Sequence, residues 1–287
     1  MGLQLKDVPS SPATSADLHG KTVAIDAPNL LYAFYAVQML RGGEKSVALR
    51  SATKSFATRI GDLAHHGARS VVIFDGPPHP LKREVLVRRD AERSYAAIGA
   101  HDYAMARDAA RAMGAPVVDA KHDAEGQACA MARAGVVDLV ATTDWDALAM
   151  GAPALLRNLS ANPSAKEGRR WSLVRADAAL DFLQTDVAGL CGAAVLMGCD
   201  YFEGLPRVGP QKALAAMRQH GSLEAALAAL CPDASFAERA LAAHELLSSP
   251  PHREPSSDLR WLPASPEALQ AALAGKPVRR VAQARLN

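Results

Sequence analysis

The 287-residue chain has few aromatic residues, little net charge and no long apolar segment. Phe, Trp and Tyr make up 5% of the residues, so Ala, Leu and Val must fill most of the core. The formal charge of +2 argues against nucleic-acid binding through bulk charge, although it leaves local basic patches open. No apolar run reaches the ~18 residues that cross a bilayer. With 49% hydrophobic and 22% charged residues, the composition is that of a folded globular protein.

The sequence also lacks the cysteine patterns of a disulfide framework or a zinc site. Its four cysteines, Cys129, Cys191, Cys199 and Cys231, form no CxxC pair and no metal-like spacing with histidine. We therefore expect reduced thiols in the core of a cytosolic protein. The N-terminus does not show the charged-then-apolar pattern of a signal peptide, which favours the same compartment.

Short apolar segments alternate with helical patterns in the first half of the chain. Strands are predicted at residues 21–26, 70–75, 115–119 and 136–141, and helices from the first strand to about residue 40, around 52–63 and at 124–134. This alternation predicts an α/β fold with a mostly parallel central sheet flanked by helices. Functional sites in such sheets lie at the carboxyl ends of the strands.

Beyond these strands, the chain is predicted to be helical or extended. The segments are an extended arm at 1–20, a helical pattern at 80–113, a helical cluster at 186–247, a loop at 250–255, and helices at 266–274 and 277–285. Gly99 divides the 80–113 pattern near its middle, so two short helices are favoured over one long helix.

Seven carboxylates fall at or near the ends of the predicted strands. They are Asp26, Asp75, Asp123, Glu125, Asp144, Asp146 and Asp200. A single Asp in such a place is most often a helix N-cap. Seven at one sheet edge would repel one another and raise each other's pKa, so divalent cations are expected between them. Oxygen-only ligands suit Mg²⁺ or Mn²⁺, and two such ions roughly 3.5–4 Å apart activate water and stabilise the leaving oxygen of a phosphodiester.

Five sequence blocks resemble, in the same order, those of the flap endonucleases, the structure-specific 5′ nucleases of DNA replication and repair. The blocks are residues 23–27, 72–78, 123–127, 141–146 and 197–201. The resemblance implies a PIN-like 5′ nuclease fold, archaeal-like with a shortened helical arch, and places all seven acids at a site for two Mg²⁺ ions, which Mn²⁺ can replace. It puts Asp26, Asp75, Glu125 and Asp144 closest to the ions, with Asp123, Asp146 and Asp200 beside them. Asp123 stands where the family usually has Glu.

Further residues acquire a role through the same resemblance. Lys82 and Arg89 lie two helical turns apart on one face, which by itself is most simply a solvated charge run. In the family such a pair contacts the scissile phosphate, and Lys82 would stabilise its developing negative charge. Tyr32 would stack on the base next to the cut, and the amine of Gly2 would lie near the active site.

The segment Gly204–Ala213 is similar to a helix–hairpin–helix core. An ordinary Pro/Gly turn explains it equally well from the residues alone. The resemblance implies that the element grips duplex DNA, helped by K⁺, with Val208, Gly209 and Lys212 as DNA contacts. The family usually has Gly where Arg207 stands, so the backbone of this turn is less free and carries an added cation.

The resulting hypothesis divides the chain into a nuclease core at 1–200, with a cap at 79–113, and a helix–hairpin–helix and C-terminal helical region at 201–287, packed as one unit. The cap is shorter than the family's arch, which puts threading of a long 5′ flap in doubt. The C-terminus lacks a complete clamp-binding motif, so a sliding clamp is not an expected partner. We expect a monomer that acts on branched or nicked DNA, makes no membrane contact, and is located in the cytoplasm with the nucleoid, or in the nucleus of a eukaryote.

Other functions stay open at this point. A 5′→3′ exonuclease, or a junction or RNA-directed nuclease, would use the same scaffold. An inactive DNA-binding scaffold protein would have lost acids from the cluster, and none is lost here. A small toxin-like RNase would be much shorter and would lack the helix–hairpin–helix.

Overall fold

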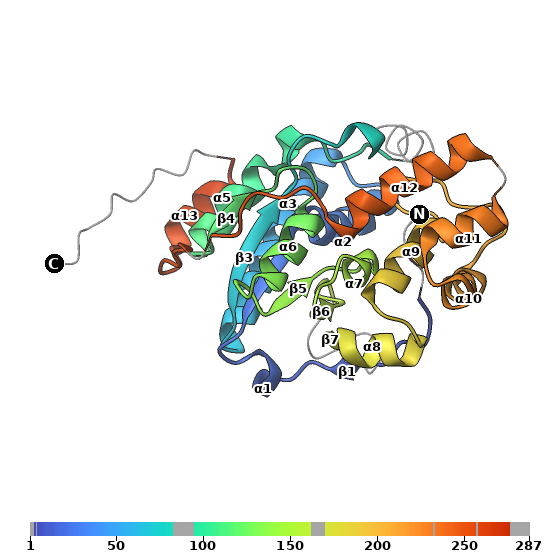
Figure 1. The fold of residues 1–287 in the computed structure, drawn as a ribbon. Helices are drawn as coiled ribbons and strands as arrows, with labels where there is room; N and C mark the ends of the chain where they lie inside the picture. The colour runs from blue at the N-terminus through green and yellow to red at the C-terminus, as the bar shows by residue number, and fades with distance from the viewer. Residues whose placement is uncertain are drawn as a thin grey trace.

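The computed structural model describes residues 3, 5–82, 95–161, 170–231, 233–256 and 258–275. Within them, one sheet runs through the centre with the strand order β1-β7-β6-β5-β2-β3-β4, and helices cover both of its faces (Figure 1). The strands are β1 (Ser11–Pro12), β2 (Thr22–Asp26), β3 (Arg69–Phe74), β4 (Val117–Asp119), β5 (Leu139–Ala141), β6 (Ala154–Arg157) and β7 (Ser172–Arg175).

The five strands β2 to β6 are parallel to one another, whereas β7 pairs antiparallel with β6 and β1. The carboxyl ends of the parallel strands therefore meet at one edge of the sheet. The four predicted strands are present as β2, β3, β4 and β5, so the predicted α/β fold is confirmed. The strands β1, β6 and β7 were not predicted.

The helices follow the predicted alternation in most places. They are α1 (Ser15–Leu18), α2 (Ala27–Leu40), α3 (Lys45–His65), α5 (Ala104–Ala112), α6 (Ala124–Arg133), α7 (Asp146–Ala149), α8 (Ala176–Leu183), α9 (Val187–Met197), α10 (Pro210–His220), α11 (Leu223–Leu230), α12 (Ala234–Ser248) and α13 (Pro266–Leu273). The predicted helices at 27–40, 52–63, 124–134 and 266–274 correspond to α2, α3, α6 and α13. The predicted helix at 277–285 lies outside the described residues.

Two predictions of local structure need correction. The 1–20 arm is not extended throughout, because Thr14 begins the one-turn helix α1 with a capping box to Asp17. The 80–113 segment is not helical throughout its described part. It has 3₁₀ turns at Pro80–Lys82 and Ala100–Tyr103, and Gly99, in extended conformation, separates residues 95–98 from the second turn.

Two hydrophobic cores lie on opposite faces of the sheet. Val23 and Ile25 of β2 pack with α2, α3 and α5, whereas Ala24 between them packs with α6 and α9. This alternation places apolar side chains on both faces, as a parallel sheet covered by helices requires. The core on the face of α6 and α9 continues into α10, α11 and α12 through residues such as Leu214 and Leu247. The division at residue 200 stays a prediction.

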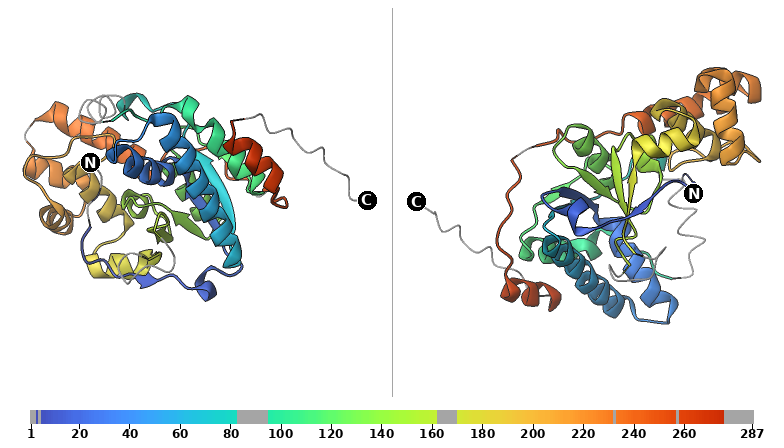
Figure 2. Two further views of the ribbon diagram at one scale, coloured as in Figure 1. Left: turned by 180° about the vertical axis from the view of Figure 1, so that it is seen from behind. Right: turned by 90° about the horizontal axis from the view of Figure 1, so that it is seen from below.

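After α12, the chain returns across the molecule as an irregular C-terminal strap, residues 249–256 and 258–265. Figure 2 shows α10–α12 at one end of the molecule and α13 at the other, with the strap between them. Gln127 of α6 exchanges two hydrogen bonds with the backbone of Arg253, at 2.8 and 2.9 Å. The Trp261 indole donates to the Ser70 carbonyl at 2.9 Å. The strap thus joins α6, β3 and the α5–α13 pair.

Three of the four cysteines lie in the core. All four cysteines are free thiols, and Cys129, Cys191 and Cys199 are buried as expected. Cys231 is only half-buried, because it follows the last turn of α11 at the surface.

Within the described ranges, no single helix combines the length and the apolar composition of a membrane span. The helices α8 and α9, which are bent relative to each other, meet the length and composition criteria only when they are counted as one segment.

Candidate active site

Six of the seven predicted acids end or follow a strand or lie at the start of a helix at the same sheet edge, and Asp200 joins them from the turn after α9. Asp26 closes β2 and caps α2, where its Oδ1 accepts from the Asn29 amide at 3.1 Å. Asp75 follows β3 and accepts from the Ala124 amide at the start of α6, at 2.8 Å. A cleft of about 910 Å³ is lined by all seven acids, Asp26, Asp75, Asp123, Glu125, Asp144, Asp146 and Asp200.

Crowding and burial make these carboxyl groups hard to ionise. Burial, with Asp75 as the next contributor, raises the pKa of Asp26 to about 8. Burial also raises the pKa of Asp75 to about 6. The pKa values of Glu125 and Asp146 lie well above the ordinary range, because both groups are buried and both face Asp144. A bound cation would relieve this repulsion.

The donor chemistry of the cleft fits a hard divalent cation. All seven acids offer oxygen, the ligand that Mg²⁺ and Mn²⁺ prefer. Among the described residues, no three His, Cys, Asp or Glu side chains are already arranged as an ion site. A lysine ammonium also lies among the acids, and its positive charge balances part of their negative charge.

That lysine is Lys82, at the end of the 3₁₀ turn that follows Asp75 and its Gly-Pro-Pro segment. Its Nζ lies 2.8 Å from Oδ1 of Asp123 and 2.8 Å from Oδ2 of Asp200. Although burial lowers the pKa of Lys82, the two carboxylates outweigh it and raise that pKa well above the ordinary value. The structure thus places Lys82 inside the predicted site. Arg89 lies outside the described residues.

The N-terminal arm also reaches the acids. The amide of Leu3 donates to Oδ1 of Asp146 at 2.6 Å, and the Leu3 side chain is buried in the core with α6 and α9. This contact brings the backbone of Leu3 to the acids, while the role expected for Gly2 stays a prediction. Gly2 itself lies outside the described residues.

Aromatic residues form a further part of the cleft lining, the aromatic wall. Tyr32 of α2 lines the cleft together with Tyr95, Ile98 and Tyr103 from the predicted cap. The hydroxyls of Tyr32 and Tyr95 lie 2.6 Å apart, and their ring centroids 6.3 Å apart. Tyr32 was predicted to contribute, whereas Tyr95 was not. The only sequence signal for Tyr95 was an aromatic residue in the cap.

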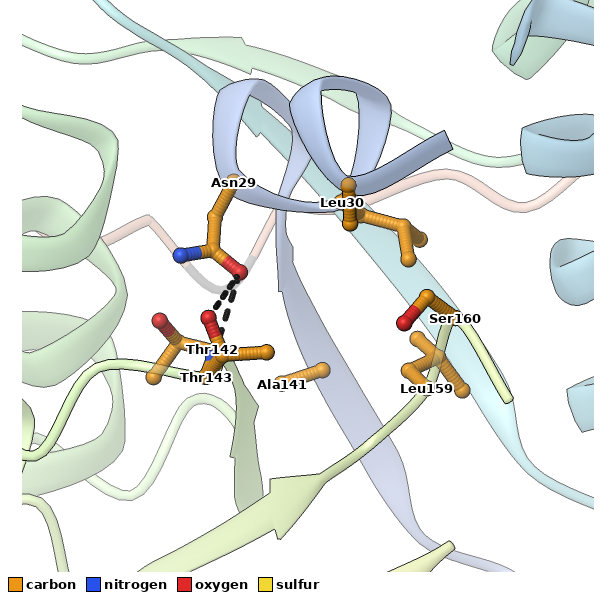
Figure 3. Close-up of a pocket in the computed structure, with 8 residues that line it drawn as sticks. Asn29, Leu30, Ala141, Thr142, Thr143, Leu159 and Ser160 are labelled. Carbon is orange, nitrogen blue, oxygen red and sulfur yellow. Dashed lines mark hydrogen bonds between the residues drawn. The ribbon is translucent and has the colours of Figure 1, made fainter. Parts of the chain in front are cut away.

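The loop that carries Asp144 is held by contacts that sequence reasoning missed. Oδ1 of Asn29 accepts from both the amide and the hydroxyl of Thr143, at 3.1 and 3.0 Å, beside a small pocket (Figure 3). Arg157 of β6 donates to the Thr143 carbonyl at 2.6 Å and stacks 3.5 Å from the ring centre of Trp145. These contacts join α2 and β6 to the loop between β5 and α7, which fixes the direction of Asp144.

The predicted helix–hairpin–helix residues form a separate surface. Val208 and Gly209 lie on the turn between α9 and α10, Lys212 lies in the first turn of α10, and none of them lines the cleft. Gly209 caps α10 and Pro210 is its first residue, so the helix N-terminus faces outward from the turn. Arg207 has φ 63°, in the left-handed region that glycine favours, and its carbonyl accepts from Lys212 at 3.4 Å.

Comparison with known proteins supports the class that fold and site define. A parallel sheet whose strand ends gather seven acids into one cleft, with a lysine among them, is the arrangement of a phosphodiester-cleaving nuclease. Residues 5–96 match the XPG N-terminal domain and residues 114–200 the XPG I-region. Flap endonuclease 1 of Methanothrix thermoacetophila is 32% identical over 264 residues, which cover 80% of this chain and 79% of that protein. The chain therefore belongs to the flap endonuclease family.

Solved structures share the fold at lower identity. The chain is similar to flap endonuclease-1 from Methanococcus jannaschii, with a TM-score of 0.72 and 24% identity over 94% of this chain and 90% of that one. It is also similar to the catalytic core of Rad2 in complex with a DNA substrate, with a TM-score of 0.75 and 20% identity over 93% and 91% of the two chains. These likenesses confirm the PIN-like architecture.

Proposed function

We propose that the chain hydrolyses DNA phosphodiester bonds at 5′ flaps or single-strand/duplex junctions, as a structure-specific 5′ endonuclease with 5′→3′ exonuclease activity in replication and repair. The observation that carries the proposal is the convergence of all seven acids in one cleft that Tyr32, Tyr95 and Tyr103 also line. The acids suit the reacting phosphate and its cations, and the aromatic wall suits a base beside it.

Each part of the cleft has a role in this reaction. Two bound Mg²⁺ ions, replaceable by Mn²⁺, would supply a water of lowered pKa and neutralise the leaving oxygen. Asp26, Asp75, Glu125 and Asp144 would hold them, with Asp123, Asp146 and Asp200 beside. Lys82 stabilises negative charge on the scissile phosphate, together with Arg89. Tyr32 stacks on the base next to the cut, and the amine of Gly2 would lie near the active site.

The turn between α9 and α10 is proposed to hold the duplex away from the chemistry. An outward-facing helix N-terminus at Gly209, with Val208 and Lys212 beside it, suits a DNA phosphate. K⁺ is the proposed helper ion there. Contacts of this kind recognise the backbone and not the base sequence, which is what a structure-specific enzyme needs.

The remaining proposals concern the cellular setting. The enzyme is proposed to act as a monomer on branched or nicked DNA, in the cytoplasm with the nucleoid or in a eukaryotic nucleus. The nuclease core at 1–200 and the helical region at 201–287 are proposed to act as one unit.

A cleavage assay tests the function directly. Flap, nicked, gapped and single-stranded DNA, with matched RNA, are incubated with Mg²⁺, with Mn²⁺ or with excess chelator, and the cut position is mapped. Cleavage is expected at or near the flap junction with either cation, and none in chelator. Cleavage only of single strands or RNA would favour the alternative nucleases. No cleavage, with DNA binding retained, would favour an inactive scaffold protein.

Two acidic substitutions test the site itself. Asp144→Ala is expected to abolish cleavage while DNA binding survives, because binding depends on phosphate contacts elsewhere. Asp200→Ala is expected to be less impaired, since this acid lies beside the cation site and pairs with Lys82. Asp181→Ala, on the exposed side of α8, is the matched control and should cleave normally. Normal turnover by Asp144→Ala would refute the assignment.

A further inference from the structure

Asn29 links the end of β2, which carries Asp26, to the loop that carries Asp144. Its backbone amide donates to Oδ1 of Asp26 at 3.1 Å. Its side-chain Oδ1 accepts from the amide and the hydroxyl of Thr143, at 3.1 and 3.0 Å (Figure 3). Because Asp26 ends β2 and Thr143 follows the neighbouring strand β5, one residue holds the ends of two adjacent strands together.

Arg157 contacts the same loop from the other neighbouring strand. It belongs to β6, which flanks β5 on the side away from β2. Its Nη2 donates to the Thr143 carbonyl at 2.6 Å, and its guanidinium lies 3.5 Å from the centre of the Trp145 ring. The planar guanidinium thus holds the residues directly before and after Asp144, one by a hydrogen bond and the other by stacking.

Thr142 holds the backbone of Asp144 itself. Its hydroxyl accepts from the Asp144 amide at 3.1 Å and donates to Oε1 of Glu125 at 3.3 Å. The loop at residues 142–145 is therefore held by contacts to α2, α6 and β6. These contacts are made to the backbone of Asp144 and to its neighbours in sequence, so they set the direction of the Asp144 side chain without using its carboxylate oxygens.

A fixed separation between two acids matters most for a small cation. Mg²⁺ requires near-octahedral coordination with bonds of about 2.0–2.1 Å, whereas Ca²⁺ accepts variable geometry at about 2.3–2.6 Å. A loop that shifts loses the geometry that Mg²⁺ needs and still suits Ca²⁺. The contacts of Asn29 and Arg157 therefore favour the smaller ion, because they keep the Asp144 loop at a fixed place relative to Asp26.

We propose that Asn29 and Arg157 are positioning residues for Asp144, and that they make the cleft prefer Mg²⁺ to Ca²⁺. The proposal rests on the proposed function, in which Asp26 and Asp144 bind the divalent cation. Loss of either positioning residue frees one side of the Asp144 loop. The affinity for Mg²⁺ then falls strongly, and the affinity for Ca²⁺ falls little.

Cation binding to the DNA-free protein tests this preference. Mg²⁺ and Ca²⁺ are titrated separately, by isothermal titration calorimetry, into the wild type and each variant. Asn29→Leu and Arg157→Met should each weaken Mg²⁺ binding by about tenfold or more. The same variants should weaken Ca²⁺ binding by about twofold or less. Equal losses for the two cations, or no loss for either, would overturn the proposal.

Two further variants separate the loop contacts from other effects. Asn29→Asp keeps an oxygen acceptor for Thr143 and should keep the wild-type ratio of Mg²⁺ to Ca²⁺ affinity; a ratio as low as that of Asn29→Leu would count against the Thr143 contact. Arg218→Met is the matched control for Arg157→Met, because Arg218 donates to the Leu183 carbonyl at 3.0 Å, away from the cleft. It should change neither affinity, and a loss equal to that of Arg157→Met would overturn the assignment.

Charge alone is the rival explanation for Arg157, and it predicts the opposite sign. Removing a positive charge beside the acids would raise the affinity for both cations, so a gain for both in Arg157→Met would overturn its positioning role. Thermal melts verify that each variant folds, and the two Asn29 variants decide the matter if Arg157→Met does not.

Failure of the proposed function is recognised separately. Asp144→Asn should lose affinity for both cations, and normal binding by this variant would refute the ligand assignment itself. If the wild type fails to cleave any flap, the proposed function is wrong, while the titrations still decide whether Asn29 and Arg157 give the cleft its cation preference.

Discussion

Asp26→Asn should stabilise the metal-free protein at high pH, because it removes a buried charge. Asp26 is 7% exposed, and burial raises the pKa of its carboxyl from 3.8 to about 8. At about 1.4 kcal/mol per pH unit, keeping this group ionised costs at most about 6 kcal/mol at pH 8. Burial of the polar amide offsets part of that gain, roughly 2–3 kcal/mol. The cap of α2 survives, because an amide oxygen can still accept from the Asn29 amide.

The expected net gain is therefore about 3 kcal/mol at pH 8, or about 5 °C in melting temperature. The sign depends on pH. Because the folded-state pKa of Asp26 is raised, the folded protein binds its proton more tightly, and wild-type stability falls as pH rises from about 4 to about 8. At pH 5, where Asp26 is already neutral in the folded protein, the gain should nearly vanish.

Thermal melts in excess chelator at pH 5 and pH 8 measure this difference. Asp138→Asn is the control with the opposite sign. The pKa of Asp138 is lowered: burial raises it, but the Thr22 amide and Lys21 outweigh that effect. Its neutralisation should cost stability at pH 8. Destabilisation by Asp26→Asn at pH 8, or an equal gain at both pH values, would refute the reasoning.

Three further predictions concern the strap, the turn and the cap. Gly114→Ala should cost about 2–4 kcal/mol of unfolding free energy, because a Cβ there would collide with the Leu262 carbonyl of the strap. Gly135→Ala, at a similar positive φ but in open space, should cost about 1 kcal/mol in the same urea titration, and equal losses would contradict the strap contact. Lys212→Ala should weaken DNA binding alike for all sequences and reduce the salt slope by about one, whereas a sequence-dependent loss would mean that the turn does not hold phosphate. Flaps with a bulky blocked 5′ end should still be cut in single-turnover reactions, because the predicted cap is short. If blocking abolishes cleavage as completely as chelation does, the cap forms a closed gateway.

Much of the site was predictable because its acids follow strands that have clear patterns of their own. Asp26 and Asp75 come directly after apolar runs, and Asp144 follows another, so a parallel sheet brings them together. Lys82 could be placed only through the family resemblance, since its local sequence is equally typical of a solvated charge run. The Asp123 contacts with Lys82 and Tyr201 join residues 41 and 78 positions apart, which no local pattern records.

The remaining features were unpredictable for a related physical reason. The strands β6 and β7 have four residues each, and their sequences show no clear alternation of apolar and polar residues. They form strands because they pair with each other and with neighbouring strands. The Asn29–Thr143 and Gln127–Arg253 bonds depend on tertiary contacts between distant segments. The bend near Gly99 was foreseen from glycine's position, yet the aromatic wall that Tyr95 forms beside it depends on where Tyr32 lies.

The C-terminal strap has a consequence for how the enzyme matures on the ribosome. The ribosome synthesises the sheet and the seven acids before the strap. Residue 253, which pairs with Gln127 of α6, is added more than a hundred residues after Gln127. Gly126 contacts Pro250 so closely that no side chain would fit there. Until that stretch leaves the exit tunnel, the helix that carries Glu125 lacks these partners. The nascent chain should therefore acquire a fully formed catalytic cleft only after residue 253 has left the exit tunnel.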